Sequence, residues 1–291
     1  MSRNAEPQPV LPLTIVVDLA VIVLVFLAGI QLYILSERTD RYFAWTIGVP
    51  LTAAFLGAGY WGALVSTVHV LRAKAWVQGR STTATAFTAT TLLLLATLIH
   101  LDKFHLDSSE FITWLAAWVW VIVYVAVPPT LVFMFFAQTR SPGTNPPGRR
   151  DLPSWMRVTL IAQSVVAAVS GLGLFLLPGE TADLWPWTLT PLTARAIGSW
   201  LCAVGATGAA ILWEGDLSRV AATMSGLTVF AALQLVAVLR YGGTVEWHDV
   251  TAWIYVVFMF SLLLVGACGL WLNWGSAQPW RGSGDRVEAT P

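Results

Sequence analysis

Two stretches of the chain repeat one short pattern. Residues 183–195 read DLWPWTLTPLTAR, and residues 40–54 read DRYFAWTIGVPLTAA. Both contain Asp, an aromatic residue, Trp-Thr and then Pro-Leu-Thr-Ala, and in both copies a Glu stands three residues before the Asp. A weaker similarity is found further along each half, between FHLD at 104–107 and WHD at 247–249. Self-similarity of this kind indicates a duplicated structural unit.

The composition indicates the environment of these units. Hydrophobic residues make up 56% of the chain and charged residues 11%, whereas roughly 25% of a soluble domain is charged. The net charge is zero and no long run of Lys or Arg occurs, which argues against a nucleic-acid partner. No phosphate-binding loop is present either, so ATP is not an expected ligand. The chain is therefore expected in a lipid bilayer.

Eight apolar segments have the length of membrane spans, because a hydrocarbon core of about 30 Å needs roughly 20 residues of helix. Each must be helical, since lipid offers no hydrogen-bond partners to an open backbone. The predicted spans are 13–35, 50–71, 84–101, 111–137, 158–177, 191–213, 220–239 and 250–274. Pro128 and Pro129 should kink or break the fourth span. The predicted fold class is an all-α polytopic membrane protein of two tandem, parallel four-helix repeats.

The distribution of basic residues predicts the orientation. With the amino terminus inside, eleven Lys or Arg fall in cytoplasmic segments and four in outer loops, Arg195 being set aside. Both termini are then cytoplasmic. The predicted organisation is a tail at 1–12, a repeat at 13–137, a Pro/Gly/Arg linker at 138–157, a repeat at 158–274 and a tail at 275–291. Fourteen of the sixteen basic residues are Arg, which suggests a GC-rich genome and a bacterial inner membrane.

The repeated pattern lies in the first outer loop of each half and ends in a helix beginning. Pro50 and Pro191 suit the first turn of a helix, and Thr190 is placed to cap it. Such a helix beginning can attract an anion. Arg195 has no counterpart in the first copy, and an Arg inside the membrane boundary is normally paired. A structural ion pair with an outer carboxylate and a substrate-binding role are both open. The candidate substrate-binding residues are Glu37, Asp40, Trp45, Glu180, Asp183, Trp187 and Arg195.

Two further sets of polar residues are candidates for function. The first set could hold a divalent metal at the outer face, or simply cap helices there: His100, His105, His248, Asp107 and Asp249. The second set is intramembrane, namely Asp18 and His69, and Asp18 could reach His69, Arg72 or Arg157. The two cysteines, Cys202 and Cys268, lie in apolar runs and indicate no disulfide framework. No cofactor is predicted apart from that metal.

Three functions are compatible with these features. The first is binding or transport of a small amphiphile or lipid at the interface of the two halves, with membrane lipids as the other partners. The second is a membrane enzyme, with or without a metal ion, that uses the outer histidines and carboxylates. The third is a structural subunit of a membrane complex. The sequence leans away from an enzyme, because no tight catalytic motif supports one.

Overall fold

The structure is a computed structural model that describes residues 8–145 and 148–274. Within these residues the regular elements are helices, and eight of them are long and apolar enough to cross a membrane. These are α1 with its π-helical continuation η1 (Pro12–Ile34), α3 (Pro50–Ala73), α4 (Trp76–Ile99), α5 (Phe111–Thr139), α6 (Ser154–Leu176), α8 (Pro191–Glu214), α9 (Ala221–Arg240) and α10 (Val250–Trp274). The prediction of an all-α protein with eight helices long and apolar enough to cross a membrane is confirmed for the described residues.

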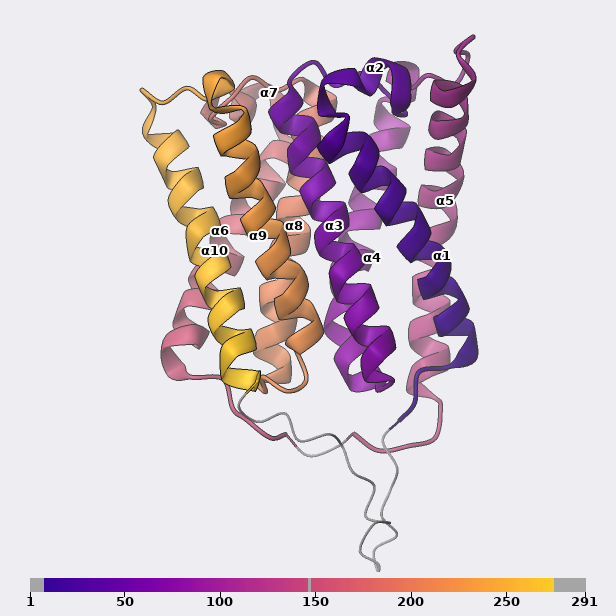
Figure 1. Cartoon of the computed structure of the whole chain (residues 1–291), viewed down its shortest axis with the longest axis vertical. Helices are drawn as coiled ribbons and strands as arrows, with labels where there is room; N and C mark the ends of the chain where they lie inside the picture. Colours follow the sequence, from indigo (N-terminus) through magenta and orange to yellow (C-terminus); the bar gives the residue numbers. More distant parts are fainter. Residues whose placement is uncertain (1–7, 146–147, 275–291) are drawn as a thin grey trace, which may run out of the picture.

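The helices form a bundle with a central and a peripheral set (Figure 1). In the centre, α3 packs against α9 and α4 packs against α8. Each central helix has one peripheral neighbour: α1 lies on α3, α5 on α4, α6 on α8 and α10 on α9. The first four spans therefore contact the last four mainly through their second and third members.

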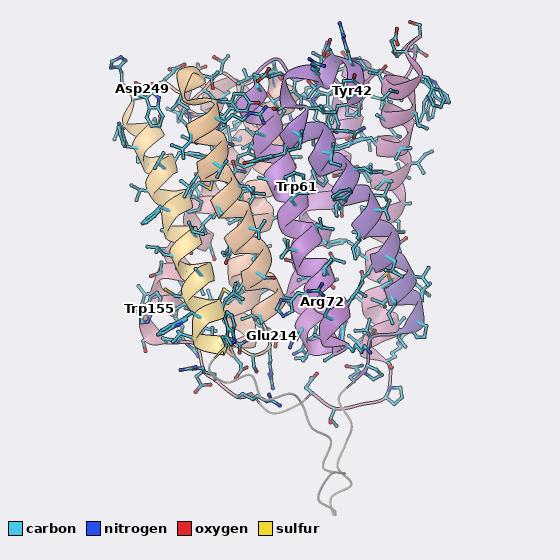
Figure 2. All side chains as sticks on the ribbon, in the orientation of Figure 1. Tyr42, Trp61, Arg72, Trp155, Glu214 and Asp249 are labelled. Atoms are coloured by element: carbon cyan, nitrogen blue, oxygen red, sulfur yellow. The ribbon has the colours of Figure 1, made fainter. Side chains whose placement is uncertain are left out.

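The two ends of the bundle are named here by what lies on them. The linker end carries the α5–α6 connection and both ends of the described chain, and the motif end carries the two repeated loops with the short helices α2 (Thr39–Tyr42) and α7 (Pro178–Thr181) (Figure 1). Figure 2 shows Tyr42 and Asp249 at the motif end, and Trp155 and Glu214 at the linker end. The tail at 275–291, with Arg281 and Arg286, and residues 1–7, with Arg3, lie outside the described residues.

The two repeated loops make the same backbone contact at the motif end. In the first half, the amide of His105 donates to the carbonyl of Ala44 at 2.9 Å. In the second half, the amide of Glu246 donates to the carbonyl of Pro186, also at 2.9 Å. Ala44 and Pro186 stand directly before the Trp-Thr of the repeated pattern. Each half thus ties its first motif-end loop to its second at the same position.

The linker end has a matching pair of contacts. The amide of Trp76, at the start of α4, donates to the carbonyl of Gln8, which precedes α1, at 3.1 Å. The amide of Leu217, ahead of α9, donates to the carbonyl of Arg150, which precedes α6, at 2.8 Å. In both halves, the segment before the first span pairs with the connection between the second and third spans.

The helices α3 and α8 begin and end alike. They start at Pro50 and Pro191, whose missing amide hydrogen would have had no helical partner. Thr190 accepts a hydrogen bond from an amide in the first turn of α8, so the predicted cap is confirmed. Both helices end at a left-handed residue, Lys74 with φ 55° and Gly215 with φ 63°. Lys74 accepts a conformation that favours glycine, because its amide closes the last turn of α3.

The interface between the halves is close-packed at its centre. A Cβ added to Gly59 of α3 would lie 2.8 Å from the ring of Trp200 in α8. One added to Gly62 would lie 2.9 Å from the carbonyl oxygen of Gly226 in α9. Small residues let membrane helices approach closely, because dispersion contacts replace the hydrophobic effect as the driving force. These glycines therefore bring the two halves into direct contact.

Two details of the predicted spans differ from the structure. The α4 helix begins at Trp76, earlier than the predicted 84, because polar residues in its first turns find partners: Ser81 lies 2.5 Å from the hydroxyl of Thr223. The α5 helix runs uninterrupted through Pro128 and Pro129, so the predicted break does not occur. Within a long helix the neighbouring turns hold the backbone on both sides of such a pair.

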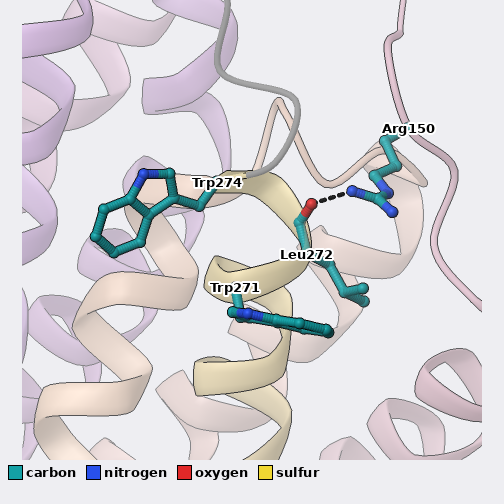
Figure 3. A pocket seen from close by; sticks show the side chains of 4 residues that line it. All are labelled: Arg150, Trp271, Leu272 and Trp274. Carbon is teal, nitrogen blue, oxygen red and sulfur yellow. Dashed lines mark hydrogen bonds between the residues drawn. The ribbon is translucent and has the colours of Figure 1, made fainter.

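The linker is fixed to the second half. Asp216 is buried and accepts a hydrogen bond from the amide of Arg150 at 2.8 Å. The Arg150 side chain donates to the carbonyl of Leu272 near the end of α10, beside a shallow hollow that Trp271 and Trp274 also line (Figure 3).

Candidate functional site

Arg195 joins the two halves at the motif end. It lies one turn into α8 and is half-buried, and its Nη1 is 2.8 Å from Nε2 of His100. His100 directly follows Ile99, the last residue of α4, and its ring reaches Arg195 in α8. The pair therefore sits where α4 of the first half meets α8 of the second.

The histidine is the neutral partner of this pair. Burial, and after it the charge of Arg195, lowers the pKa of His100 below its usual value of 6.5. At neutral pH its Nε2 thus accepts a hydrogen bond from the guanidinium. The neighbouring Asp102 is itself paired, because its carboxylate is 2.8 Å from Lys103 Nζ, and this bond lowers the pKa of Asp102. Arg195 therefore has a neutral hydrogen-bond partner in His100.

The carboxylates expected to pair with Arg195 lie elsewhere. Among the described residues, none of the ion pairs within 4.0 Å includes Arg195. Glu37 approaches Arg240 at 3.9 Å, and Asp40 approaches Arg41 at the same distance. Glu180 and Asp183 are exposed. A guanidinium has five N–H donors and His100 takes one, so Arg195 can still bind an anion.

A second arginine at the motif end provides a contrast. Arg240, at the end of α9, donates to the carbonyl of Tyr33 at 3.1 Å and lies 3.9 Å from Glu37. Its guanidinium carbon also stands 4.7 Å from the centre of the Tyr241 ring. Arg240 thus has a carbonyl, a carboxylate and an aromatic face as partners from its own chain. Of these two arginines at the junction of the halves, Arg195 is the one without an acidic partner.

The predicted binding residues Trp45 and Trp187 are core residues. Their side chains are 2% and 1% exposed. Trp187 donates from Nε1 to the hydroxyl of Thr52 in the first half at 2.8 Å, and Trp45 packs edge-on against Trp120 of α5. The sequence suggested a role in binding substrate for both rings, but they are buried where the repeated loops pack on the bundle. Both indoles therefore hold the loops to the helices.

The predicted metal ligands are not brought together. The sequence proposed His100, His105, His248, Asp107 and Asp249. Over residues 8–145 and 148–274, no three His, Cys, Asp or Glu side chains are grouped so that they could hold a metal ion. His105 instead contacts the carbonyl of Phe43 and the hydroxyl of Thr46, both at 3.1 Å, while His248 is exposed. His105 acts as a tie between the two loops of the first half.

The intramembrane candidates Asp18 and His69 are both half-buried, on α1 and α3. Within the described part of the chain, neither side chain makes a hydrogen bond or an ion pair, so the expected link between them is not formed. Arg157, a further expected partner of Asp18, donates to the carbonyl of Leu152 at 3.2 Å.

The sequence reasoning missed a buried carboxylate at the linker end. Glu214, the last residue of α8, has a side chain that is 6% exposed. Its Oε2 lies 2.8 Å from Arg80 of α4 and 3.9 Å from Arg219. The signal available in the sequence was an acidic residue at the end of an apolar run. Two basic residues, Arg80 and Arg219, occur in connections predicted at the same end of the bundle.

The guanidinium of Arg195 has N–H donors beyond the one that His100 accepts from. A guanidinium held by a neutral imidazole presents N–H donors to an anion, and planar, bidentate contact with phosphate or carboxylate is the geometry that Arg favours. Comparisons of the chain with protein-family models, with curated proteins and with solved structures find no match.

Proposed function

We propose that this membrane protein binds an anionic amphiphile, a lipid with a phosphate or carboxylate headgroup, at Arg195. The observation that carries the proposal is a half-buried guanidinium one turn inside a span, held by neutral His100 and without a carboxylate partner among the described residues. A charge at this depth is unfavourable unless it is paired, and a lipid headgroup is the anion available at the membrane boundary.

The proposal includes an internal duplication of the chain. We infer two tandem, parallel four-helix repeats, at 13–137 and 158–274, because the repeated loop pattern is accompanied by matching backbone contacts at both ends of the bundle. An even number of spans in each unit makes both units enter the membrane from the same side. The first copy has Ala54 at the position of Arg195, so the site is confined to one of the two equivalent corners.

We place the linker end in the cytoplasm of a bacterial cell, on the excess of Lys and Arg in the segments at that end. In a variant lacking Cys202 and Cys268, we expect Asp183→Cys to react with an impermeant maleimide added to intact cells. Thr144→Cys should react only after the cells are opened. The reverse labelling pattern would overturn the orientation and put the Arg195 site on the cytoplasmic face.

The packing favours binding over transport. The centre of the interface between the halves is filled by Gly59 against Trp200 and Gly62 against Gly226. A ligand at Arg195 would thus rest on the rim of this interface, whereas the sequence suggested a site between the halves. A carrier would need the halves to separate along these contacts.

Arg195→Gln and Arg240→Gln form a matched pair for testing the site. Native mass spectrometry of the purified protein should measure binding of phosphatidylglycerol, with phosphatidylcholine as the zwitterionic comparison. Losing one charge-assisted contact is expected to weaken phosphatidylglycerol binding about tenfold in Arg195→Gln. Arg240→Gln should bind as the natural protein does, because its guanidinium is already engaged.

Two further outcomes sharpen this test. Competition by inorganic phosphate at a similar concentration would assign the site to a free anion instead of a lipid. Equal binding by the two variants, with melting temperatures like that of the natural protein, would overturn the proposal.

A second candidate function is that of a structural subunit of a membrane complex. The close-packed interface of the halves favours it, since a scaffold needs a rigid interior and no passage. Purification of the protein as a lone species that binds phosphatidylglycerol through Arg195 would count against this role.

A further inference from the structure

An apolar groove of about 440 Å³ runs between α6 and α10, and Arg195 is not among the residues that line it. These two peripheral helices meet there without another helix covering them. Its walls are formed largely by Val166 of α6 and by Trp253, Val257 and Phe258 of α10. Val257 is 65% exposed, so the groove opens onto the face that the bilayer covers.

The floor of the groove is polar and incompletely bonded. Gln163 of α6 is 6% exposed, and its Nε2 donates to the hydroxyl of Ser261 in α10 at 3.0 Å. Ser261 in turn donates to the carbonyl of Phe258 at 2.7 Å. Gln163 Oε1 is buried and has no hydrogen-bond partner among the described residues. A buried acceptor without a donor is unfavourable by about 1–3 kcal/mol, so an outside donor would be stabilised here once the Gln163 amide turns its oxygen toward the groove.

The shape of the groove favours a hydrocarbon chain over another helix. Helices that associate in a membrane approach over small residues, whereas the rim here carries Trp253, Val257 and Phe258. Trp253 is fixed by a hydrogen bond from its Nε1 to the carbonyl of Trp247 at 3.3 Å, and it stands at the motif end of the groove. A single flexible chain can lie between such side chains, and the ring would border its entry from the headgroup region.

The depth of Gln163 specifies the ligand further. It is the tenth residue of the 23-residue α6, so it lies about 14 Å along the helix, near the middle of the membrane. A headgroup does not reach this depth. The donor that would satisfy Oε1 must therefore be attached to the chain itself, and a hydroxyl is the simplest such group.

We propose that the α6–α10 groove binds one hydrocarbon chain of an amphiphile that carries a hydroxyl at mid-chain, donated to Gln163 Oε1. This site is separate from Arg195 and does not rest on the function proposed above. The proposal distinguishes the groove from ordinary annular contact, because it predicts a preference for a hydroxyl at one depth.

A photoactivatable stearic acid with a mid-chain diazirine would test the site on the purified full-length protein. We expect crosslinks to the segments 154–176 and 250–274. Stearic acid and mid-chain hydroxystearic acid then serve as competitors, and the hydroxylated acid should compete about fivefold better, the ratio expected of one net hydrogen bond. Gln163→Leu should remove this preference while still binding stearic acid.

Two substitutions on α6 separate the groove from the general lipid surface. Ala162→Trp fills the groove and should abolish the crosslink, whereas Ile161→Trp, at the same depth but at an exposed residue that does not line the groove, should leave it intact. The proposal fails if the two variants crosslink equally. It also fails if the two fatty acids compete equally with the natural protein.

Discussion

Glu214→Gln is expected to lower the free energy of unfolding by about 3 kcal/mol, because it leaves the guanidinium of Arg80 without its buried counter-charge. The Glu214 carboxylate is 6% exposed and lies 2.8 Å from Arg80, which belongs to the other half of the chain. The change can be measured by thermal unfolding in detergent with tryptophan fluorescence. The ion pair therefore contributes to holding α8 and α4 together at the linker end.

Two variants test the origin of that loss. Glu180→Gln removes an exposed carboxylate at the motif end and should stay within about 0.5 kcal/mol of the natural protein. The double variant Glu214→Leu, Arg80→Leu should recover much of the stability, because Arg80 is then no longer a guanidinium left without its counter-charge. If Glu214→Gln alone melts like the natural protein, the carboxylate does not stabilise the fold in the way described.

The second large effect is expected at Gly171 of α6. A Cβ there would lie 2.7 Å from the amide nitrogen of Cys202 and 2.8 Å from the carbonyl oxygen of Gly198, both backbone atoms of α8. Backbone cannot move aside as a flexible side chain can, so Gly171→Val should cost about 3 kcal/mol or more and force α6 away from α8. Thermal unfolding and the yield of correctly folded protein would both report the loss.

Gly173 provides the matched control, two residues along the same helix. The nearest atom to a Cβ at Gly173 is the Cγ2 of Thr181 at 3.3 Å, the end of a side chain. Gly173→Val changes helix propensity by the same amount as Gly171→Val, so the difference between the variants isolates the α6–α8 contact. Similar melting temperatures for both would contradict the packing described for Gly171.

The candidate site could be anticipated only in part. Arg195 is recognisable in the sequence, because a charge inside an apolar span stands out and the repeated pattern has Ala54 in its place. Its partner His100 was not recognisable as such, since the two are distant in sequence and only the packing of α4 on α8 brings them together. The nearby acids were the more plausible partners by charge, yet their loops carry them away from the guanidinium.

The burial of Trp45 and Trp187 in the repeated loops was not predictable from the sequence. Both rings border apolar runs, and that pattern cannot tell an accessible ring from one covered by a loop. The hydrogen bond from Trp187 to Thr52 crosses from one half to the other. Such contacts depend on how the repeats face each other, which no local pattern records.

The sequence by itself determined the eight spans and their helical form, because the thickness of the bilayer and the need to satisfy the backbone act on each segment separately. It also placed Arg195 near a membrane boundary. Only the tertiary structure decided that Arg195 pairs with His100, that Glu214 is buried against Arg80, and that Gln163 keeps an unpartnered oxygen in a groove. Those features arise where helices distant in the chain come into contact, so the exposure and pairing of their polar groups follow from the packing of the whole bundle.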